Sequence, residues 1–125
     1  MKSGDLIPRH GVAPKMTCGK IVYPNISVNW GTIYDAAAET QTALEINADP
    51  HRLDLADTRV QAAKESGVRF IISTDSHGLS DFGFMSYGLA MARRGWLEKR
   101  DVLNTRTYQG LMKWIEKRRS SASNV

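Results

Sequence analysis

The sequence has 125 residues, enough for one ordinary domain with its own core, and its single cysteine, Cys18, excludes an internal disulfide. No apolar run approaches the roughly 20 residues of a membrane-spanning helix, and the start lacks the pattern of a signal peptide, so we expect a cytoplasmic protein with no membrane partner. The net charge of +4 is uneven, because residues 93–119 carry nine Lys or Arg against three Asp or Glu.

The first part of the chain is rich in proline and glycine and has no periodic apolar run, so we expect an irregular arm over residues 1–28. The pattern changes at Asn29, a favourable N-cap, after which apolar residues recur on one helical stripe. We therefore predict a helix from Asn29 to about Thr40 that packs on a sheet.

Two predicted strands flank a second helix. The alternation in TALEINA, residues 42–48, predicts one strand. The near-continuously apolar VRFIIST, residues 68–74, predicts another that is buried on both faces. Between them, Asp54 is expected to cap a helix that ends at Gly67.

Two further helices complete the predicted elements. FGFMSYGLAMARRG predicts a helix from Phe84 to Arg94 with Gly95 as its stop. LNTRTYQGLMKWIEKRR predicts a last helix, capped by Asn104 or Thr105. Its apolar stripe comprises Tyr108, Leu111, Met112 and Ile115.

The order of helix, strand, helix and strand is typical of an α/β protein with parallel strands. We expect the folded unit to span residues 29–119, followed by a polar tail over residues 120–125. Because two parallel strands leave faces and edges uncovered, the chain resembles the closing segment of a larger barrel. An exposed sheet surface also favours self-association or a complementing chain.

The stretch FIISTDSHG carries the first candidate site, because Asp75 and His77 directly follow a predicted parallel strand. Reactive groups gather at the carboxyl ends of such strands. A carboxylate and an imidazole offer the mixed donor set that suits Zn, Mn or Fe, but stable sites need three or four protein ligands. The plainer alternative is that Asp75 caps the next turn and His77 is an ordinary loop residue.

Further metal ligands are few. Glu45 lies on the neighbouring predicted strand, while His10 and Cys18 lie in the arm. Nucleophile elbows, phosphate loops and dinucleotide fingerprints are absent from the sequence.

The basic segment from residue 93 to residue 119 is a second candidate site. Clustered positive charge favours phosphate-bearing partners such as DNA, although a solvated helix face is the commoner cause. Its tryptophans, Trp96 and Trp114, are suited to stacking on bases, although core or surface anchoring is the commoner role. The candidate nucleic-acid contacts are Arg93, Arg94, Lys99 and Arg100.

The segments ALEINADPHRLDLADTRVQAAKESGVRFIISTDSH and MSYGLAMARRGWLEKRDVLNT resemble the C-terminal part of the PHP (polymerase and histidinol phosphatase) domain of bacterial family X DNA polymerases. The resemblance covers about residues 33–117. The Asp-x-His pair is shared by PHP proteins generally, whereas ARRGWLEKRDVLNT resembles the polymerase-linked branch.

This resemblance implies the closing strands and helices of a distorted (β/α)7 barrel with a divalent metal cluster, Mn or Zn with Fe as an alternative. In the family the cluster hydrolyses phosphodiesters, as a 3′–5′ exonuclease that processes DNA ends in DNA repair. Asp75 and His77 match the last metal motif of the family. The opening His-x-His motif has no counterpart, and Met16 stands where the family has a ligating histidine.

The sequence therefore predicts a truncated PHP phosphoesterase whose metal centre is incomplete. One alternative is a catalytically inactive remnant that binds DNA or another protein through its basic third. A second alternative is a histidinol-phosphatase-like phosphomonoesterase, which shares Asp-x-His but not the RRGWLEKRDVLNT stretch.

Overall fold

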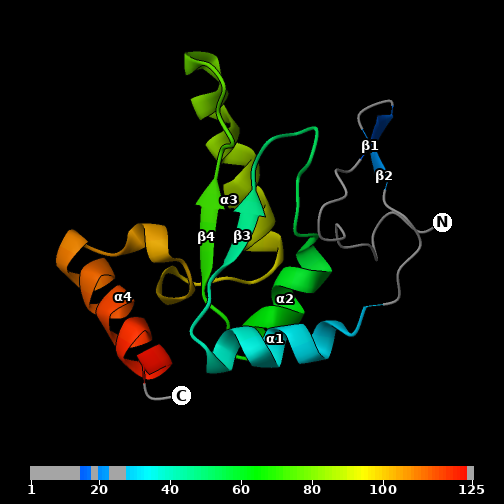
Figure 1. Cartoon of the computed structure of the whole chain (residues 1–125). Helices are drawn as coiled ribbons and strands as arrows, with labels where there is room; N and C mark the ends of the chain where they lie inside the picture. The colour runs from blue at the N-terminus through cyan, green and yellow to red at the C-terminus, as the bar shows by residue number, and fades with distance from the viewer. Residues whose placement is uncertain (1–14, 18–19, 23–27, 124–125) are drawn as a thin grey trace.

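The structure is a computed structural model that describes residues 15–17, 20–22 and 28–123 (Figure 1). Helices and strands alternate over most of this length. In chain order the strands and α-helices are β1 Lys15–Thr17, β2 Lys20–Val22, α1 Trp30–Glu39, β3 Leu44–Asn47, α2 Asp57–Glu65, β4 Phe70–Ser73, α3 Met85–Arg94 and α4 Tyr108–Ser123. Three 3₁₀ helices join the later elements, namely η2 Leu79–Phe84, η3 Lys99–Asp101 and η4 Leu103–Thr105.

Strands β3 and β4 form a parallel pair that runs in register from Leu44 opposite Phe70 to Asn47 opposite Ser73. The predicted α/β fold with parallel strands is therefore confirmed, although the described residues form an open sheet and no closed barrel. Strands β1 and β2 pair antiparallel with each other in a separate sheet. This hairpin lies in the segment that was expected to be irregular.

Irregular segments extend both edges of the β3–β4 sheet. The N–H of Asn47 donates to the carbonyl of Asp54 beside β3, and Val102 bridges to Phe70 beside β4 in a parallel sense. Asp54 therefore extends the sheet through its backbone, and the prediction that it caps α2 is wrong. Ala56 occupies the N-cap position of α2 instead.

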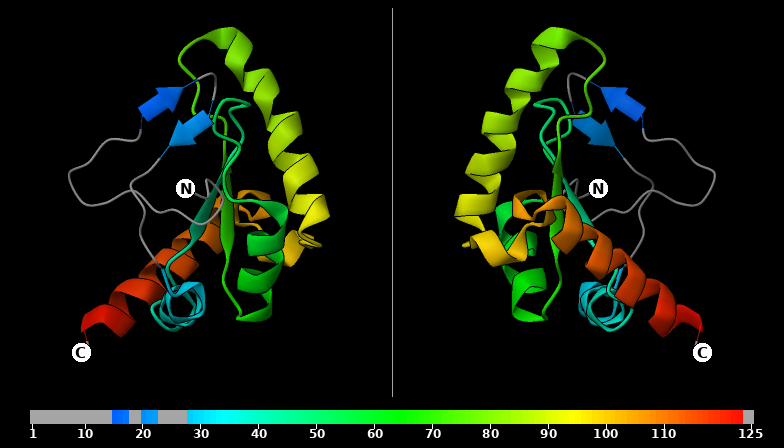
Figure 2. Two further views of the ribbon diagram at one scale, coloured as in Figure 1. Left: turned by 90° about the vertical axis from the view of Figure 1, so that its right-hand side faces the viewer. Right: turned by 90° about the vertical axis from the view of Figure 1, so that its left-hand side faces the viewer.

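One face of the sheet is buried and the other is open to solvent. Ile46, Phe70 and Ile72 are at most 4% exposed, and Figure 2 shows α2 and α3 on one side of the two strands. Ile71 points to the opposite face and is 42% exposed. The prediction that β4 is buried on both faces is therefore wrong, because α2 and α3 cover Ile72 whereas Ile71 on the other face stays exposed.

Helix α3 approaches the sheet closely at Gly88. A Cβ atom there would lie 2.5 Å from Ile72 Cγ2 and 2.9 Å from Ala48 Cβ. Glycine is favoured at this position because any Cβ atom would force the helix or the sheet to shift. The helix ends as predicted, with Gly95 at its C-cap.

Helices α1 and α4 lie toward the amino ends of β3 and β4 (Figure 1). Asn29 caps α1 as predicted, since its side-chain oxygen accepts from the N–H of Thr32 at 3.1 Å. Helix α4 begins later than predicted. Asn104 and Thr105 belong to η4, and Thr107 accepts from the N–H of Gly110 at 3.1 Å in the first turn of α4.

The expected apolar stripe of α4 is only partly buried. Leu111, Met112 and Ile115 are half-buried, whereas Tyr108 is 75% exposed. Among the described residues, no helix is both long enough and apolar enough to cross a membrane.

Candidate functional site

The first candidate site lies where β3 and β4 end, because the parallel pairing brings their carboxyl ends to one edge. Asn47 and Ser73 are partners at the last paired position, and the N–H of Ala48 donates to the carbonyl of Ser73 at 2.7 Å. The polar residues that follow each strand therefore start from neighbouring positions. We name this region the carboxyl edge, comprising residues 47–54 and 73–81.

Asp75 leaves β4 in the left-handed backbone region, with a φ of 52°. Aspartate tolerates this region better than most residues because its short side chain can bond locally. The N–H of Asp75 donates to Ser73 Oγ at 3.2 Å, which holds the turn.

The carboxylate of Asp75 turns toward the end of β3. Its Oδ2 atom accepts from Asn47 Nδ2 at 3.3 Å and lies 3.5 Å from Arg52 Nε. The side chains of Asp75 and Arg52 are 33% and 48% exposed, so solvent screens this ion pair. Asp75 is a positioned carboxylate, and its present partners are an amide and a guanidinium.

His77 is exposed two residues further along. Its backbone N–H donates to Asp81 Oδ2 at 2.9 Å, which fixes the start of the loop into η2. Within the described part of the chain, its imidazole has no hydrogen bond or ion pair. The ring is therefore free to accept a ligand from solvent.

The end of β3 carries a separate turn that sequence reasoning left out of the site. The N–H of Asp49 donates to Asn47 Oδ1 at 3.0 Å, and Asp49 Oδ1 accepts from the N–H of His51 at 2.9 Å. The His51 imidazole Nδ1 also lies 2.9 Å from Asp49 Oδ1. These bonds, the backbone one foremost, lower the pKa of Asp49 below its usual 3.8.

The pKa of Asp54 is shifted in the opposite direction to that of Asp49. Although the residue as a whole is exposed, partial desolvation of its carboxyl group raises the pKa of Asp54. Nearby Arg59 and Arg52 oppose the rise, and Glu45 adds to it. The carboxylates of Glu45 and Asp54 thus repel each other near the end of β3.

No protein-family model matches the chain. A sequence comparison finds similarity to the DNA polymerase/3′-5′ exonuclease PolX of Bacillus subtilis (strain 168), with 38% identity over 85 residues. The match covers 68% of this chain and 15% of that protein. The chain is therefore related to a part of PolX.

Of the further metal ligands that the sequence predicted, only Glu45 lies among the described residues, and it does not join Asp75 and His77. Glu45 is exposed on β3, on the face of the sheet opposite the buried Ile46. His10 and Cys18 lie outside the described residues. Within the described ranges, no three His, Cys, Asp or Glu side chains are grouped so that they could hold a metal ion.

The described donor set therefore does not fit a metal cluster. Asp75 already pairs with Arg52 and Asn47, and two ligands are fewer than the three or four of stable protein sites. The carboxyl edge brings Asp75 into a polar network, but it does not form a complete metal centre from residues 28–123.

The four basic residues predicted to contact nucleic acid lie at the end of α3 and in η3. Arg94 is bound to Asp57, with Nη2 and Nε at 2.8 and 2.9 Å from Oδ2. Arg100 pairs with Glu98 at 3.1 Å, whereas Arg93 and Lys99 are exposed. Two of the four are thus engaged in ion pairs on the surface.

Proposed function

We propose that this chain is a segment of a PHP-type domain related to PolX, which supplies Asp75 and His77 to a DNA-directed phosphoesterase. The 38% identity over 85 residues carries the proposal, because it links the chain to a protein named as a DNA polymerase and 3′-5′ exonuclease. The place of Asp75 beyond a parallel strand supports it, since chemistry in α/β sheets gathers there.

In this proposal the segment holds only part of the hydrolytic site. A phosphoesterase of this class uses divalent metal, Mn, Zn or Fe, and the ligands beyond Asp75 and His77 would come from outside the described residues. Metal supplies Lewis acidity and a hydroxide at neutral pH when it is bound. The contribution of the described residues is to hold the Asp75 carboxylate at the sheet edge through Asn47 and Arg52.

A chimaera tests this proposal directly. The aligned 85 residues of B. subtilis PolX are replaced by those of this chain, and exonuclease activity is measured on 3′-labelled DNA. We expect the chimaera to retain metal-dependent activity and to lose it with Asp75→Asn and His77→Ala together. A matched variant at an exposed carboxylate of α2, Glu65→Gln, should retain it.

A correctly folded but inactive chimaera would contradict the proposal, and so would one whose activity survives the double substitution. Elemental analysis of the isolated chain adds a second measurement. We expect less than one Mn, Zn or Fe per chain, and stoichiometric metal with exonuclease activity would show that the centre is complete after all.

The sheet surface favours a second function, an interaction with another chain. Ile71 is 42% exposed on the face opposite α2 and α3, and a second chain that covered this face would bury its side chain. Size-exclusion chromatography with light scattering tests it, because Ile71→Thr should weaken any dimer. The phosphomonoesterase alternative has no comparable support, since the relative found acts on DNA by its name.

A further inference from the structure

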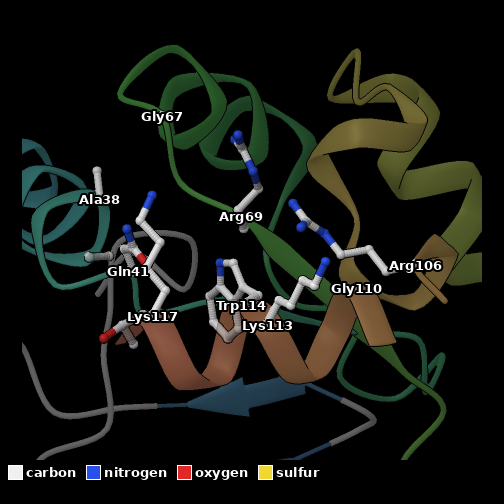
Figure 3. Close-up of a pocket in the computed structure, with 11 residues that line it drawn as sticks. Ala38, Gln41, Gly67, Arg69, Arg106, Gly110, Lys113, Trp114 and Lys117 are labelled. Atoms are coloured by element: carbon white, nitrogen blue, oxygen red, sulfur yellow. The ribbon is translucent and has the colours of Figure 1, made fainter. Parts of the chain in front are cut away.

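A pocket of about 440 Å³ lies at the opposite end of the sheet from Asp75, between the end of α1 and helix α4 (Figure 3). The segment that leads into β4 closes it from a third side. Among the described residues it is lined by Ala37, Ala38, Gln41, Thr42, Gly67, Arg69, Arg106, Gly110, Lys113, Trp114 and Lys117. We name it the basic pocket.

Four of these residues are cations, and none of the described lining residues is acidic. Arg106, Lys113 and Lys117 form no ion pair within the described ranges. Arg69 is the exception, since its Nη1 lies 3.9 Å from Oδ1 of the buried Asp101. That contact anchors one cation, while three others lack a counter-ion among the described residues.

Three of the cations lie on α4 or just before it. Lys113 and Lys117 are four residues apart, about 6 Å along a helix, and Arg106 precedes the first turn. In Figure 3 Trp114 stands between Lys113 and Lys117, and Arg106 and Lys113 point to the same side of the pocket. A row of charges of this kind matches an extended anion better than a single phosphate.

Two uncharged groups complete the surface. Trp114 is half-buried and offers an aromatic ring among the cations. The Oε1 atom of Gln41 is buried and has no hydrogen-bond partner among the described residues. An unsatisfied buried acceptor is rare in native proteins, and it points to a hydrogen-bond donor on a ligand, such as an N–H group of a base.

We propose that the basic pocket binds single-stranded nucleic acid, with phosphodiesters on Arg69, Arg106, Lys113 and Lys117 and one base stacked on Trp114. A positively charged groove with an aromatic platform is the usual way in which proteins hold single strands. A duplex keeps its bases stacked on each other and would leave Trp114 without a base. An acidic peptide would satisfy the cations but would not use the ring.

This inference stands apart from the metal ligands, because the pocket lies beyond the amino ends of the strands and shares no residue with the carboxyl edge. It keeps Trp114 from the sequence prediction but changes the phosphate contacts, because Arg93, Arg94, Lys99 and Arg100 are not among the residues that line the pocket. The two proposals can fail independently of each other.

Fluorescence anisotropy of the full chain with a labelled oligodeoxythymidine tests the inference over about 50 to 200 mM salt. We expect binding that weakens steeply with salt. Replacing Lys113 and Lys117 by Gln should reduce the slope of log Kobs against log salt by about 1.4, because each contact on a single strand contributes about 0.7. The matched control is Arg118→Gln with Arg119→Gln, which removes the same charge at exposed positions of α4 that do not line the pocket.

The aromatic contact has its own test. Trp114→Ala should weaken binding roughly fivefold or more, whereas Tyr87→Ala, at an exposed aromatic residue outside the pocket, should not. Circular dichroism melting checks whether each variant folds. If Trp114→Ala unfolds, the variants at the exposed Lys113 and Lys117 still test the inference.

Three results would overturn the inference: no binding at low salt, equal losses in the pocket and control variants, or displacement of the oligonucleotide by polyglutamate as effective as displacement by unlabelled DNA. Loss of metal-dependent activity in the chimaera described above would not affect these binding measurements, because oligonucleotide binding requires neither metal nor catalysis.

Discussion

The side chain of Asn104 takes the place of a neighbouring strand beside Ile72. Its Oδ1 accepts from the N–H of Ile72 at 2.8 Å, and its Nδ2 donates to the carbonyl of the same residue at 3.0 Å. Val102 bridges to Phe70 just before it, so the segment after η3 continues the sheet without forming a regular strand. The VLNT stretch thus has a structural role at the edge of β4.

Replacing Asn104 by Ala should therefore destabilise the fold. Both hydrogen bonds are lost together, and the N–H and carbonyl of Ile72 lose their partner, which costs about 1–3 kcal/mol in the free energy of unfolding. Urea denaturation measures it, with Gln109→Ala as an exposed control that should change stability by less than about 0.5 kcal/mol. Equal midpoints for the two variants would contradict the role assigned to Asn104.

Gly88 sets the distance between α3 and the sheet. Gly88→Ala would place a methyl group against Ile72 and Ala48, and overpacking of this kind costs about 1–3 kcal/mol. Alanine gains about 1 kcal/mol in helix propensity, so we expect a net loss of stability in thermal denaturation. Gly83→Ala is the matched control, because a Cβ atom there meets nothing within 4 Å. A Gly88→Ala variant as stable as Gly83→Ala would show that α3 can move away freely.

The backbone of Asp75 separates two kinds of substitution. Asp75→Asn keeps a side chain that tolerates a φ of 52° and removes only the charge, whereas Asp75→Ala also adds backbone strain. We expect Asp75→Ala to be less stable than Asp75→Asn by about 1 kcal/mol, at the lower end of the cost of such strain. Chemical denaturation of the two variants side by side checks this. If their stabilities are equal, the turn tolerates alanine and its conformation is not set by residue 75.

Local signals in the sequence predict a helix boundary well where a single capping residue sets it. Asn29 caps α1 and Gly95 ends α3 because a cap depends on neighbours along the chain. Asp54 looks like an equally good cap, yet its carbonyl pairs with Asn47 across the sheet edge. That pairing depends on how the loop returns to β3, which no local pattern contains.

The candidate sites divide in the same way. The placement of Asp75 and His77 after a parallel strand follows from the strand pattern, but the partners of Asp75 depend on its left-handed turn. The strand pattern did contain a signal for Asn47. Asn47 and Ser73 hold corresponding places near the ends of the two predicted strands, so parallel pairing places the two residues side by side. For the basic pocket, the charge of residues 93–119 and Trp114 gave a partial signal, but the other lining comes from residues 37–42 and 67–69, which no local pattern connects to that segment.

The Asp49–His51 turn gives a pH-dependent prediction. Bonds from His51 lower the pKa of Asp49 in the folded chain, so this carboxylate contributes stability above its ordinary pKa of 3.8. The contribution is lost as the pH falls through the lower pKa of the folded state.

His51→Ala keeps the backbone donor but removes the imidazole, and the pKa of Asp49 should then move part of the way back toward 3.8. Titration of the Asp49 side-chain carboxyl carbon by NMR follows this shift, and His77→Ala serves as a matched histidine replacement outside the turn. An unchanged Asp49 pKa in His51→Ala would assign the lowering to the backbone N–H and the nearby Arg52, and not to the imidazole.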